Sequence, residues 1–444
     1  MTDLPDRRSW AEPTAVDDAV DAVRSAAHDL HRPGDLDRLV ERFGDCTYVL
    51  IGDASHGTSE YYRWRSRLTA RLLQERAFSF VAVEGDWTDC YEIDRYVKAM
   101  PEAAETAREA LEAFERWPTW LWANWEVLEL IDWLGLHNRG LAEEDRVGFY
   151  GLDVYGLFES MAAVVEYLEG VDPEAADEAR DAYRCFEPYG ENAQEYARAT
   201  RMVPESCEDE VVDVLTELRR GTGEYDRGRD DHFDAEQNAL VARNAERYYR
   251  EMVGGAADSW NVRDRHMTET LERLRDHHGP GAKGIVWAHN THVGDARATD
   301  MESRGRINLG QLVRERVGRD ETALVGTGSY RGSVVAAERW GADLEEMPVP
   351  VAREGSYEHV FHRAGGRDRL LLTDDLDDSA LAEPRGHRAI GVVYRPERER
   401  GNYVPTVLPE RYDAFLYLDE TRALHPIETH VDRDAVADLY PWGL

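Results

Sequence analysis

The stretch VLIGDASHGTSEYYRWRSR, residues 49–67, contains the signals that decide the fold. Its first apolar residues are typical of a buried parallel strand, and the residues after the turn predict a helix over about 59–74. Asp53 and His56 lie between these elements, where Gly57 permits close backbone approach or a positive φ value. The stretch therefore predicts a strand and then a helix, with titratable side chains at the carboxyl end of the strand.

Short apolar runs alternate with helical patterns along much of the chain. Parallel strands need long connections, usually helical, so this order predicts an α/β fold in which helices flank a mostly parallel central sheet. The further strand candidates are SFVAVEGD (79–86), RVGFYGLD (146–153), KGIVWAHN (283–290), TALVGTGS (322–329) and HRAIGVVYRP (387–396).

One long stretch, from about 157 to 278, has few strand candidates and is rich in Glu, Ala, Arg, Leu and Tyr. We expect a large helical insertion there that forms one wall of a cleft. The expected organisation is thus an N-terminal part of the α/β core at 1–155, the mainly helical insertion at 156–280, and the C-terminal part of the core at 281–444.

The formal net charge of the 444-residue chain is -36, and lysine occurs only at Lys98 and Lys283. So much negative charge opposes binding to nucleic acid or to an anionic membrane. An acidic, lysine-poor composition resembles that of halophilic proteins, in which a carboxylate-rich surface stays hydrated at high salt. We interpret the charge as an adaptation of the surface to habitat.

The four cysteines, Cys46, Cys90, Cys185 and Cys207, lack the short paired spacings of zinc sites and redox motifs, which fits a reducing compartment. The N-terminal residues contain no apolar signal core, and no run of about 18 apolar residues occurs. These observations predict a cytoplasmic protein that does not associate with membranes.

Titratable residues follow four of the strand candidates. Parallel strands end at one edge of a sheet, so side chains that are distant in sequence should meet there. One such residue alone is more often a polar strand cap, but four coincident clusters favour a functional site. The clusters are Asp53 with His56, Glu84 with Asp86, Asp153 alone, and His289 with His292.

These residues are suited to general-base hydrolysis. His56, oriented by Asp53 or Glu84, would take a proton from water as the water attacks a carbonyl carbon. The developing negative charge, or the leaving oxygen, then needs a donor. The candidates for this second role are His289, His292 and Arg65.

Two other functions use the same cluster. Asp53, His56, Glu84, His289 and His292 would be sufficient ligands for a divalent metal such as zinc or manganese, which makes the alternative a metal-dependent hydrolase. A binding or biosynthetic accessory protein would keep the cleft without turnover. A serine nucleophile elbow and phosphate-binding glycine motifs are absent from the sequence.

A second set of residues is predicted to support the site. Trp122 and Asn124 lie in an aromatic stretch that could line an apolar pocket, although such spacing is more often core packing. The segment SWNVRDRHM, residues 259–267, could brace the site from behind. The supporting residues are therefore Glu60, Trp122, Asn124, Asp153, Arg263 and His266, with Asp264 beside them.

Three motifs together resemble the erythromycin esterase family, which includes succinoglycan biosynthesis proteins: GDASHGTSEYYRWRSR, FVAVEGDW and WAHNTHVGD. The resemblance runs from about residue 45 to 425. It implies hydrolysis of an ester, specifically a macrolide lactone, by water that the first-motif histidine, His56, activates. It also implies a deep active-site cleft between the α/β core and the helical insertion. We expect a small-molecule ester or lactone substrate and no obligatory cofactor. The matching family positions are Glu84, Arg65, His289 and His292, and Asp53 stands where the family usually has glutamate.

Overall fold

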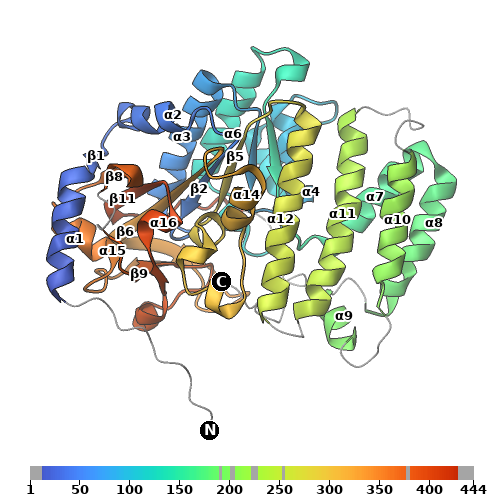
Figure 1. The fold of residues 1–444 in the computed structure, drawn as a ribbon. Coiled ribbons are helices and arrows are strands. Elements are labelled where there is room, and N and C mark those ends of the chain that lie inside the picture. The colour runs from blue at the N-terminus through green and yellow to red at the C-terminus, as the bar shows by residue number, and fades with distance from the viewer. Residues whose placement is uncertain are drawn as a thin grey trace, which may run out of the picture.

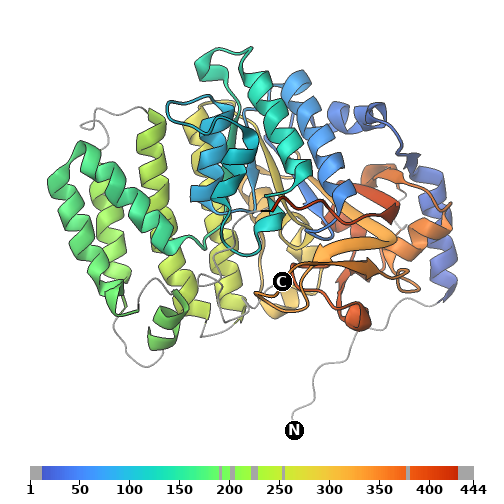
Figure 2. The ribbon, with the colours of Figure 1, turned by 180° about the vertical axis from the view of Figure 1, so that it is seen from behind.

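The computed structural model describes residues 13–189, 193–200, 206–221, 229–252, 256–376 and 381–428. Its centre is a nine-stranded sheet with helices on both faces (Figure 1 and Figure 2). The predicted α/β class with a mostly parallel sheet is confirmed. The outermost parts of the expected N-terminal and C-terminal core segments, 1–12 and 429–444, lie outside the described residues.

Six neighbouring strands of the sheet are parallel and run in the order β11-β6-β2-β5-β3-β4. They are β2 (Tyr48–Asp53), β3 (Phe80–Val83), β4 (Gly148–Gly151), β5 (Gly284–His289), β6 (Thr322–Ala336) and β11 (Ala414–Thr421). Antiparallel strands complete the sheet: β8 (Arg369–Leu372) beside β11, β1 (His28–Asp29) beside β8, and β7 (Glu345–Val349) beside β6.

Two hydrophobic cores lie on opposite faces of the sheet because the parallel strands are buried on both sides. One core contains side chains from α2 (Asp37–Phe43), α3 (Ser59–Arg76) and α6 (Trp125–Asn138), with the short α5 (Ala107–Ala110) beside them. The other contains side chains from α1 (Pro13–Ala26), α12 (Ala256–His278), α14 (Leu309–Val317) and α15 (Tyr357–Arg363). Helix α4 (Trp87–Val97) contributes to both. None of the described helices is long and apolar enough to cross a membrane.

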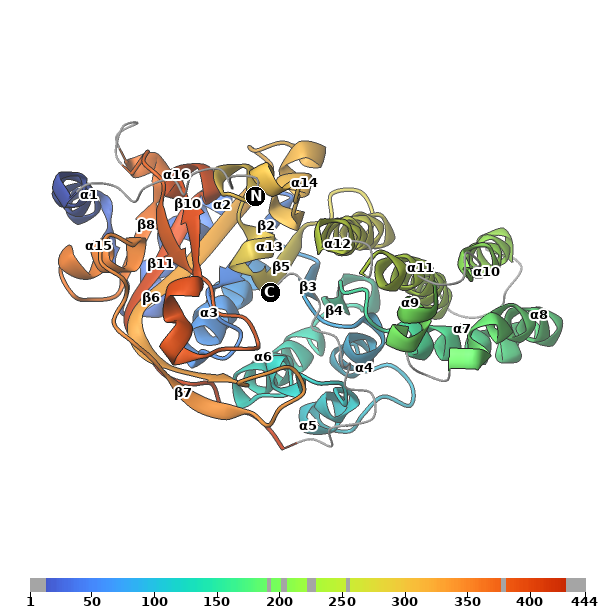
Figure 3. The same ribbon diagram turned by 90° about the horizontal axis from the view of Figure 1, so that it is seen from below.

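A group of helices extends beyond the β4 edge of the sheet (Figure 3). It comprises α7 (Leu157–Val171), α8 (Pro173–Tyr183), α9 (Ala193–Thr200), α10 (Glu208–Gly221) and α11 (Arg229–Met252). These helices enclose two small apolar cores of their own. Helix α12, which follows them, packs on the sheet itself through Met267, Leu271 and Leu274. The division at 155 and 280 into three parts stays a prediction.

The stretch 387–396, expected to form a strand, does so only in part. Strand β9 (Arg385–Arg388) pairs with β10 (Tyr403–Thr406) in a separate antiparallel ribbon, and beyond it only single bridges form, at Ile390 and Val393. The nearby segment 403–406 supplies an antiparallel partner for 385–388, whereas β6 is already paired with β2, β11 and β7.

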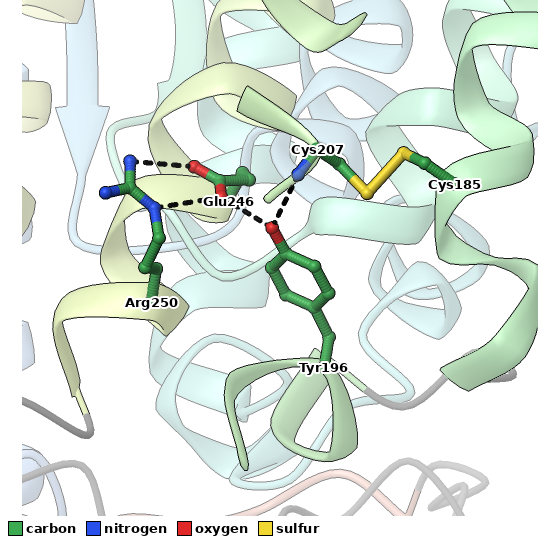
Figure 4. The surroundings of a disulfide bond; sticks show 5 residues. All are labelled: Cys185, Tyr196, Cys207, Glu246 and Arg250. Carbon is green, nitrogen blue, oxygen red and sulfur yellow. Dashed lines mark hydrogen bonds and ion pairs between the residues drawn. A yellow bond between two sulfur atoms is a disulfide. The ribbon is translucent and has the colours of Figure 1, made fainter. Parts of the chain in front are cut away.

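The cysteines differ from expectation, because Cys185 and Cys207 form a disulfide while Cys46 and Cys90 are free and buried. Disulfides are rare in reducing compartments, so the cysteine content no longer supports the expected location. The bond ties the end of α8 to the start of α10 (Figure 4). Next to it, the backbone N–H of Cys207 donates to the Tyr196 hydroxyl, which donates to buried Glu246.

Gly57 is required by close packing of two backbones. Its φ is not positive, so of the two sequence-based reasons for glycine only close approach applies. A Cβ at this position would lie 1.8 Å from the carbonyl oxygen of Val335, whose own N–H donates to the Gly57 carbonyl at 2.9 Å. The turn that carries His56 is thereby fixed against β6.

Replacing Gly57 with alanine should destabilise the protein by about 1–3 kcal/mol or more, because the new methyl group can be accommodated only if one backbone moves. Urea unfolding followed by circular dichroism measures the change. Gly34→Ala is the matched control, since a Cβ at Gly34 would contact nothing within 4 Å. Equal stabilities for the two variants would contradict this account of the turn.

Candidate active site

The carboxyl ends of four adjacent parallel strands bring the predicted residues together. Asp53 ends β2 and pairs in register with His289 at the end of β5. Glu84 follows β3 and Asp153 follows β4, the next two strands across the sheet. All four residues are buried. The convergence expected from parallel strands is therefore present.

His56 lies between two carboxylates. Its Nδ1 is 3.4 Å from Oδ1 of Asp53, and its Nε2 is 3.9 Å from Oε2 of Glu84. The Tyr62 hydroxyl donates to the His56 carbonyl oxygen and anchors the turn. Burial disfavours the charged imidazole, but the charges of Asp53 and Glu84 outweigh it and raise the pKa of His56. The ring is thus held as a base that gains a proton readily.

Glu84 is oriented through both oxygens. Its Oε2 accepts the backbone N–H of His289 at 2.7 Å, and its Oε1 accepts Nη2 of Arg263 at 2.6 Å. Burial alone would raise the pKa of Glu84, but His292, Arg263 and His56 lower it well below its usual range. Glu84 is therefore a fixed, ionised carboxylate beside His56.

Arg263, from α12, is the hub of this cluster. It binds both oxygens of Asp153, through Nε at 2.8 Å and Nη2 at 2.6 Å, and also contacts Glu84. Its Nη1 donates to Nε2 of His292 at 2.9 Å. Despite burial, these carboxylates raise the pKa of Arg263 further, so its charge is permanent. One guanidinium therefore joins groups at the ends of three strands.

His292 is locked in place. Its Nδ1 lies 2.9 Å from Oδ1 of Asp264, its Nε2 accepts from Arg263, and its ring stacks on Trp260 with centroids 4.4 Å apart. Asp264 also accepts the backbone N–H of Leu309. Both ring nitrogens of His292 are thus engaged, which fits positioning better than proton transfer.

His289 differs from His292 because one of its nitrogens is unengaged. Its Nδ1 accepts the backbone N–H of Thr291 at 3.3 Å and lies 2.8 Å from the Thr291 hydroxyl oxygen. With both Thr291 groups donating to Nδ1, the proton of the neutral ring is on Nε2. Within the described residues, this buried Nε2 has no hydrogen-bond partner. Burial and the charge of His56 lower the pKa of His289 to about 3, and the two imidazole rings lie 5.0 Å apart. His289 is therefore a neutral N–H donor near His56.

Arg65 lies behind the site rather than in it. Its Nη1 is 2.7 Å from Oδ2 of Asp53, and its guanidinium packs over the rings of Tyr62 and Trp287. It holds the Asp53 carboxylate that faces His56. The sequence had suggested charge stabilisation on the substrate, whereas this position fits orientation of Asp53.

The supporting residues fall into two groups. Trp122 donates from Nε1 to the Glu84 carbonyl oxygen, and His266 contacts the Asp153 carbonyl oxygen through Nε2, so both brace strand ends. Burial lowers the pKa of His266 to about 4 and keeps it neutral. Asn124 and Glu60 are not part of the cluster: Asn124 caps α6 through Val127, and Glu60 accepts the backbone N–H of Arg422.

A cavity of about 120 Å³ lies beside these residues. Its polar lining includes the cluster residues His56, Glu84, Asp153 and Arg263. Aromatic side chains also line it, and they come from the 114–122 segment, from Tyr155, from Trp340 and from the end of α11, which carries Tyr248 and Tyr249. The cavity is suited to a substrate with an apolar body.

Sequence reasoning did not identify the cavity residues supplied by the helical segment, Tyr248, Tyr249 and Met252. They lie in an amphipathic helical pattern that gives no sign of which residues face a strand end. Arg116 and Asp89, also in the lining, were missed as well. The aromatic-rich stretch around Trp117 was the available signal for Arg116.

The metal hypothesis named five ligands. Among the described residues, no three His, Cys, Asp or Glu side chains are arranged to hold a metal ion. Each carboxylate of the cluster instead faces a cationic partner: Asp53 faces Arg65, and Glu84 faces Arg263. Arg263 also donates to His292 Nε2. The donor set therefore does not fit a preformed metal centre.

The fold and the site define an α/β protein in which a mostly parallel sheet gathers a histidine, carboxylates and arginines at its strand ends, beside a cavity with aromatic lining. Comparison with known proteins gives the family, because the family model described as erythromycin esterase matches residues 73–421. The chain belongs to the erythromycin esterase family. This confirms the family inferred from the sequence motifs; the matched residues contain the second and third motifs, and the first, at 52–67, lies before them.

Individual relatives are distant. An erythromycin esterase type II of Escherichia coli is 19% identical over 391 residues, covering 82% of this chain and 90% of that protein. The crystal structure of a succinoglycan biosynthesis protein is 19% identical with a TM-score of 0.78, covering 94% of this chain and 100% of the other. An open-conformation mutant of the erythromycin esterase EreC is 16% identical with a TM-score of 0.66, covering 88% of this chain and 95% of that chain. These structures confirm the fold.

Removing the guanidinium of Arg263 should lower the stability of the protein. Arg263→Gln leaves the buried carboxylates of Glu84 and Asp153 without their cation, so we expect a loss of about 3–5 kcal/mol in the free energy of unfolding at pH 7. Denaturant unfolding measures it. Arg316→Gln breaks an exposed ion pair with Glu272 and should cost less than about 1 kcal/mol. Similar losses of unfolding free energy in both variants would contradict the role given to Arg263.

Proposed function

We propose that this protein hydrolyses a carboxylic ester or lactone by general-base activation of water at His56. The observation that carries the proposal is the position of His56 in the cavity lining, between Asp53 at Nδ1 and Glu84 near Nε2. Membership of the erythromycin esterase family supports ester hydrolysis as the reaction class.

Asp53 sets the tautomer of the base. With Nδ1 facing the Asp53 carboxylate, the proton of neutral His56 resides there and Nε2 carries the free lone pair. Aspartate is one methylene shorter than the usual glutamate, and the contact of 3.4 Å is correspondingly long for a direct hydrogen bond. Arg65 compensates by fixing the other oxygen of the carboxylate.

Nε2 of His56 takes the proton as the water oxygen attacks the carbonyl carbon. The gap of 3.9 Å to Glu84 exceeds a direct hydrogen bond and is of a size that a bridging water can span. The ionised Glu84 stabilises the imidazolium that forms. The imidazolium then protonates the leaving oxygen as the tetrahedral intermediate collapses to carboxylic acid and alcohol.

His289 is the best placed of the candidate donors for the oxyanion. It stays neutral, its Nε2–H is unengaged within the described residues, and its ring neighbours His56. We assign His292 and Arg65 to positioning, because His292 contacts Asp264 and Arg263, and Arg65 contacts Asp53. No divalent metal is required in this scheme.

Hydrolysis of a panel of simple esters and macrocyclic lactones tests the proposal. His56→Ala should lower kcat roughly 10²- to 10⁴-fold, because the general base is lost. Chelator should leave wild-type turnover unchanged. His31→Ala, at an exposed position outside the helices and strands, is the control and should retain activity.

Three other outcomes would contradict part of the proposal. Activity that is lost with chelator and restored by zinc or manganese would favour a metal-dependent hydrolase. Equal turnover in wild type and His56→Ala would refute the assigned base. Binding of esters without any product would favour the accessory-protein function.

The pH profile tests the electrostatics around His56. Only the neutral imidazole accepts a proton from water, so kcat/KM should fall as pH decreases through the raised pKa, with a midpoint above about 6.5. Asp53→Asn removes a charge that raises this pKa, so the acidic limb should move to lower pH and the maximal rate should drop. The exposed Glu75→Gln should leave the limb in place. An unmoved limb in Asp53→Asn would contradict the assignment.

A further inference from the structure

Three buried polar side chains are connected by hydrogen bonds behind the end of β5. Glu358 lies in the first turn of α15, His387 in β9, and Asn290 directly after the last residue of β5. Nδ1 of His387 is 2.7 Å from Oε1 of Glu358, and its Nε2 is 3.1 Å from Nδ2 of Asn290. These three residues, here termed the buried network, have no role in the hydrolysis proposed above.

The protonation of the buried network follows from its surroundings. Burial lowers the pKa of His387 more than Glu358 raises it, so the ring is neutral. Burial alone would raise the pKa of Glu358, but hydrogen bonds from His387 and from the backbone of Arg388 lower it. An ionised carboxylate can only accept, so His387 carries its proton on Nδ1 and accepts through Nε2. The Asn290 amide is therefore held in one orientation.

The surroundings of the buried network are largely apolar. The ring of His387 neighbours those of Tyr412 and Phe415 in the core to which α15 contributes. In the part of the protein that the structure describes, Oε2 of Glu358 has no hydrogen-bond partner. Burying an ionised carboxylate costs free energy that a well-packed apolar side chain would not cost. Packing alone therefore does not account for Glu358 and His387.

Asn290 connects the ends of neighbouring strands. Its Nδ2 donates to the Thr327 carbonyl oxygen in β6 at 2.8 Å, and its Oδ1 accepts the Thr327 N–H at 3.3 Å. The amide also fits against Gly52 of β2, where a Cβ would lie 2.1 Å from Oδ1 of Asn290. The Thr327 hydroxyl in turn accepts the backbone N–H of Ala54, directly after β2. One side-chain amide is thus fitted between β2 and β6 at the end of β5.

We propose that the buried network positions the proposed active site. The Asn290 amide, held in one orientation, keeps the ends of β2 and β5 at the spacing that places the N–H of His289 beside His56. Asn290 directly follows His289, and β2 leads into the turn that carries His56. The inference rests on the proposed function for the roles of these two imidazoles, whereas the contacts of the buried network are independent of it.

Replacing Asn290 with leucine tests the positioning role. Leucine has a similar shape but cannot bind Thr327 or His387, so kcat for the ester panel should fall about 10- to 100-fold while KM changes little. Asn138→Leu is the matched control. Asn138 is also buried and donates to two backbone carbonyls, but it lies at the amino end of β4, away from the strand ends of the site. Both variants should lose stability, and only Asn290→Leu should lose kcat.

Two substitutions of His387 separate positioning from a general loss of stability. Both remove the hydrogen bond to Glu358, but glutamine can present an amide oxygen to Asn290 where Nε2 accepts, and leucine cannot. We expect kcat of His387→Gln to exceed that of His387→Leu by about tenfold, measured on folded protein. Equal kcat values in these two variants, or an unchanged kcat in Asn290→Leu, would overturn the inference.

Nuclear magnetic resonance reports the same geometry without turnover. In protein labelled with carbon-13 in its histidine rings, the signals of His56 and His289 are assigned by replacing each with alanine. They should move in Asn290→Leu and stay in place in Asn138→Leu. Such a result supports the buried network even if the wild type hydrolyses no ester, in which case only the proposed function fails. Unmoved signals in Asn290→Leu would refute the buried network and leave the proposed reaction intact.

Discussion

The arrangement of the site depends on one buried cation. Arg263 reaches from α12 to Asp153 after β4, to Glu84 after β3 and to His292 after β5. Without it, the buried carboxylates of Asp153 and Glu84 would lack their cationic partner, which strongly destabilises a folded protein. Because α12 follows the helical segment directly, the same contact also attaches that segment to the sheet edge where the chemistry is proposed.

The surroundings of the two imidazoles, His56 and His289, shift their pKa values in opposite directions. His56 faces Asp53 and Glu84, which raise its pKa, while His289 lies in an environment that lowers its pKa to about 3. Neighbouring groups whose pKa values are driven apart by their surroundings commonly divide proton acceptance and donation between them. The third imidazole, His292, has both nitrogens occupied and fixes the geometry.

The sequence was sufficient to place the cluster at the strand ends but not to assign every role. Parallel strands imply convergence, whereas the insertion of β5 between β2 and β3 depends on pairing between distant segments. Arg65 was expected at the substrate, yet Tyr62 lies one turn before it on the same helix face, and that spacing indicates a buried stack. Asn124 precedes a helical pattern, a usual N-cap signal that outweighs a pocket role.

The division of labour between the sheet and the helical segment follows from these contacts. The groups proposed to act on the reacting bond lie on strand ends, whose positions the sheet register fixes. The end of α11 instead supplies part of the cavity wall, through Tyr248 and Tyr249. Just before them, buried Glu246 binds Tyr196 and Arg250 beside the Cys185–Cys207 disulfide (Figure 4). Substitutions in this helical segment can therefore reshape the cavity without displacing His56, which separates the choice of substrate from the proposed chemistry.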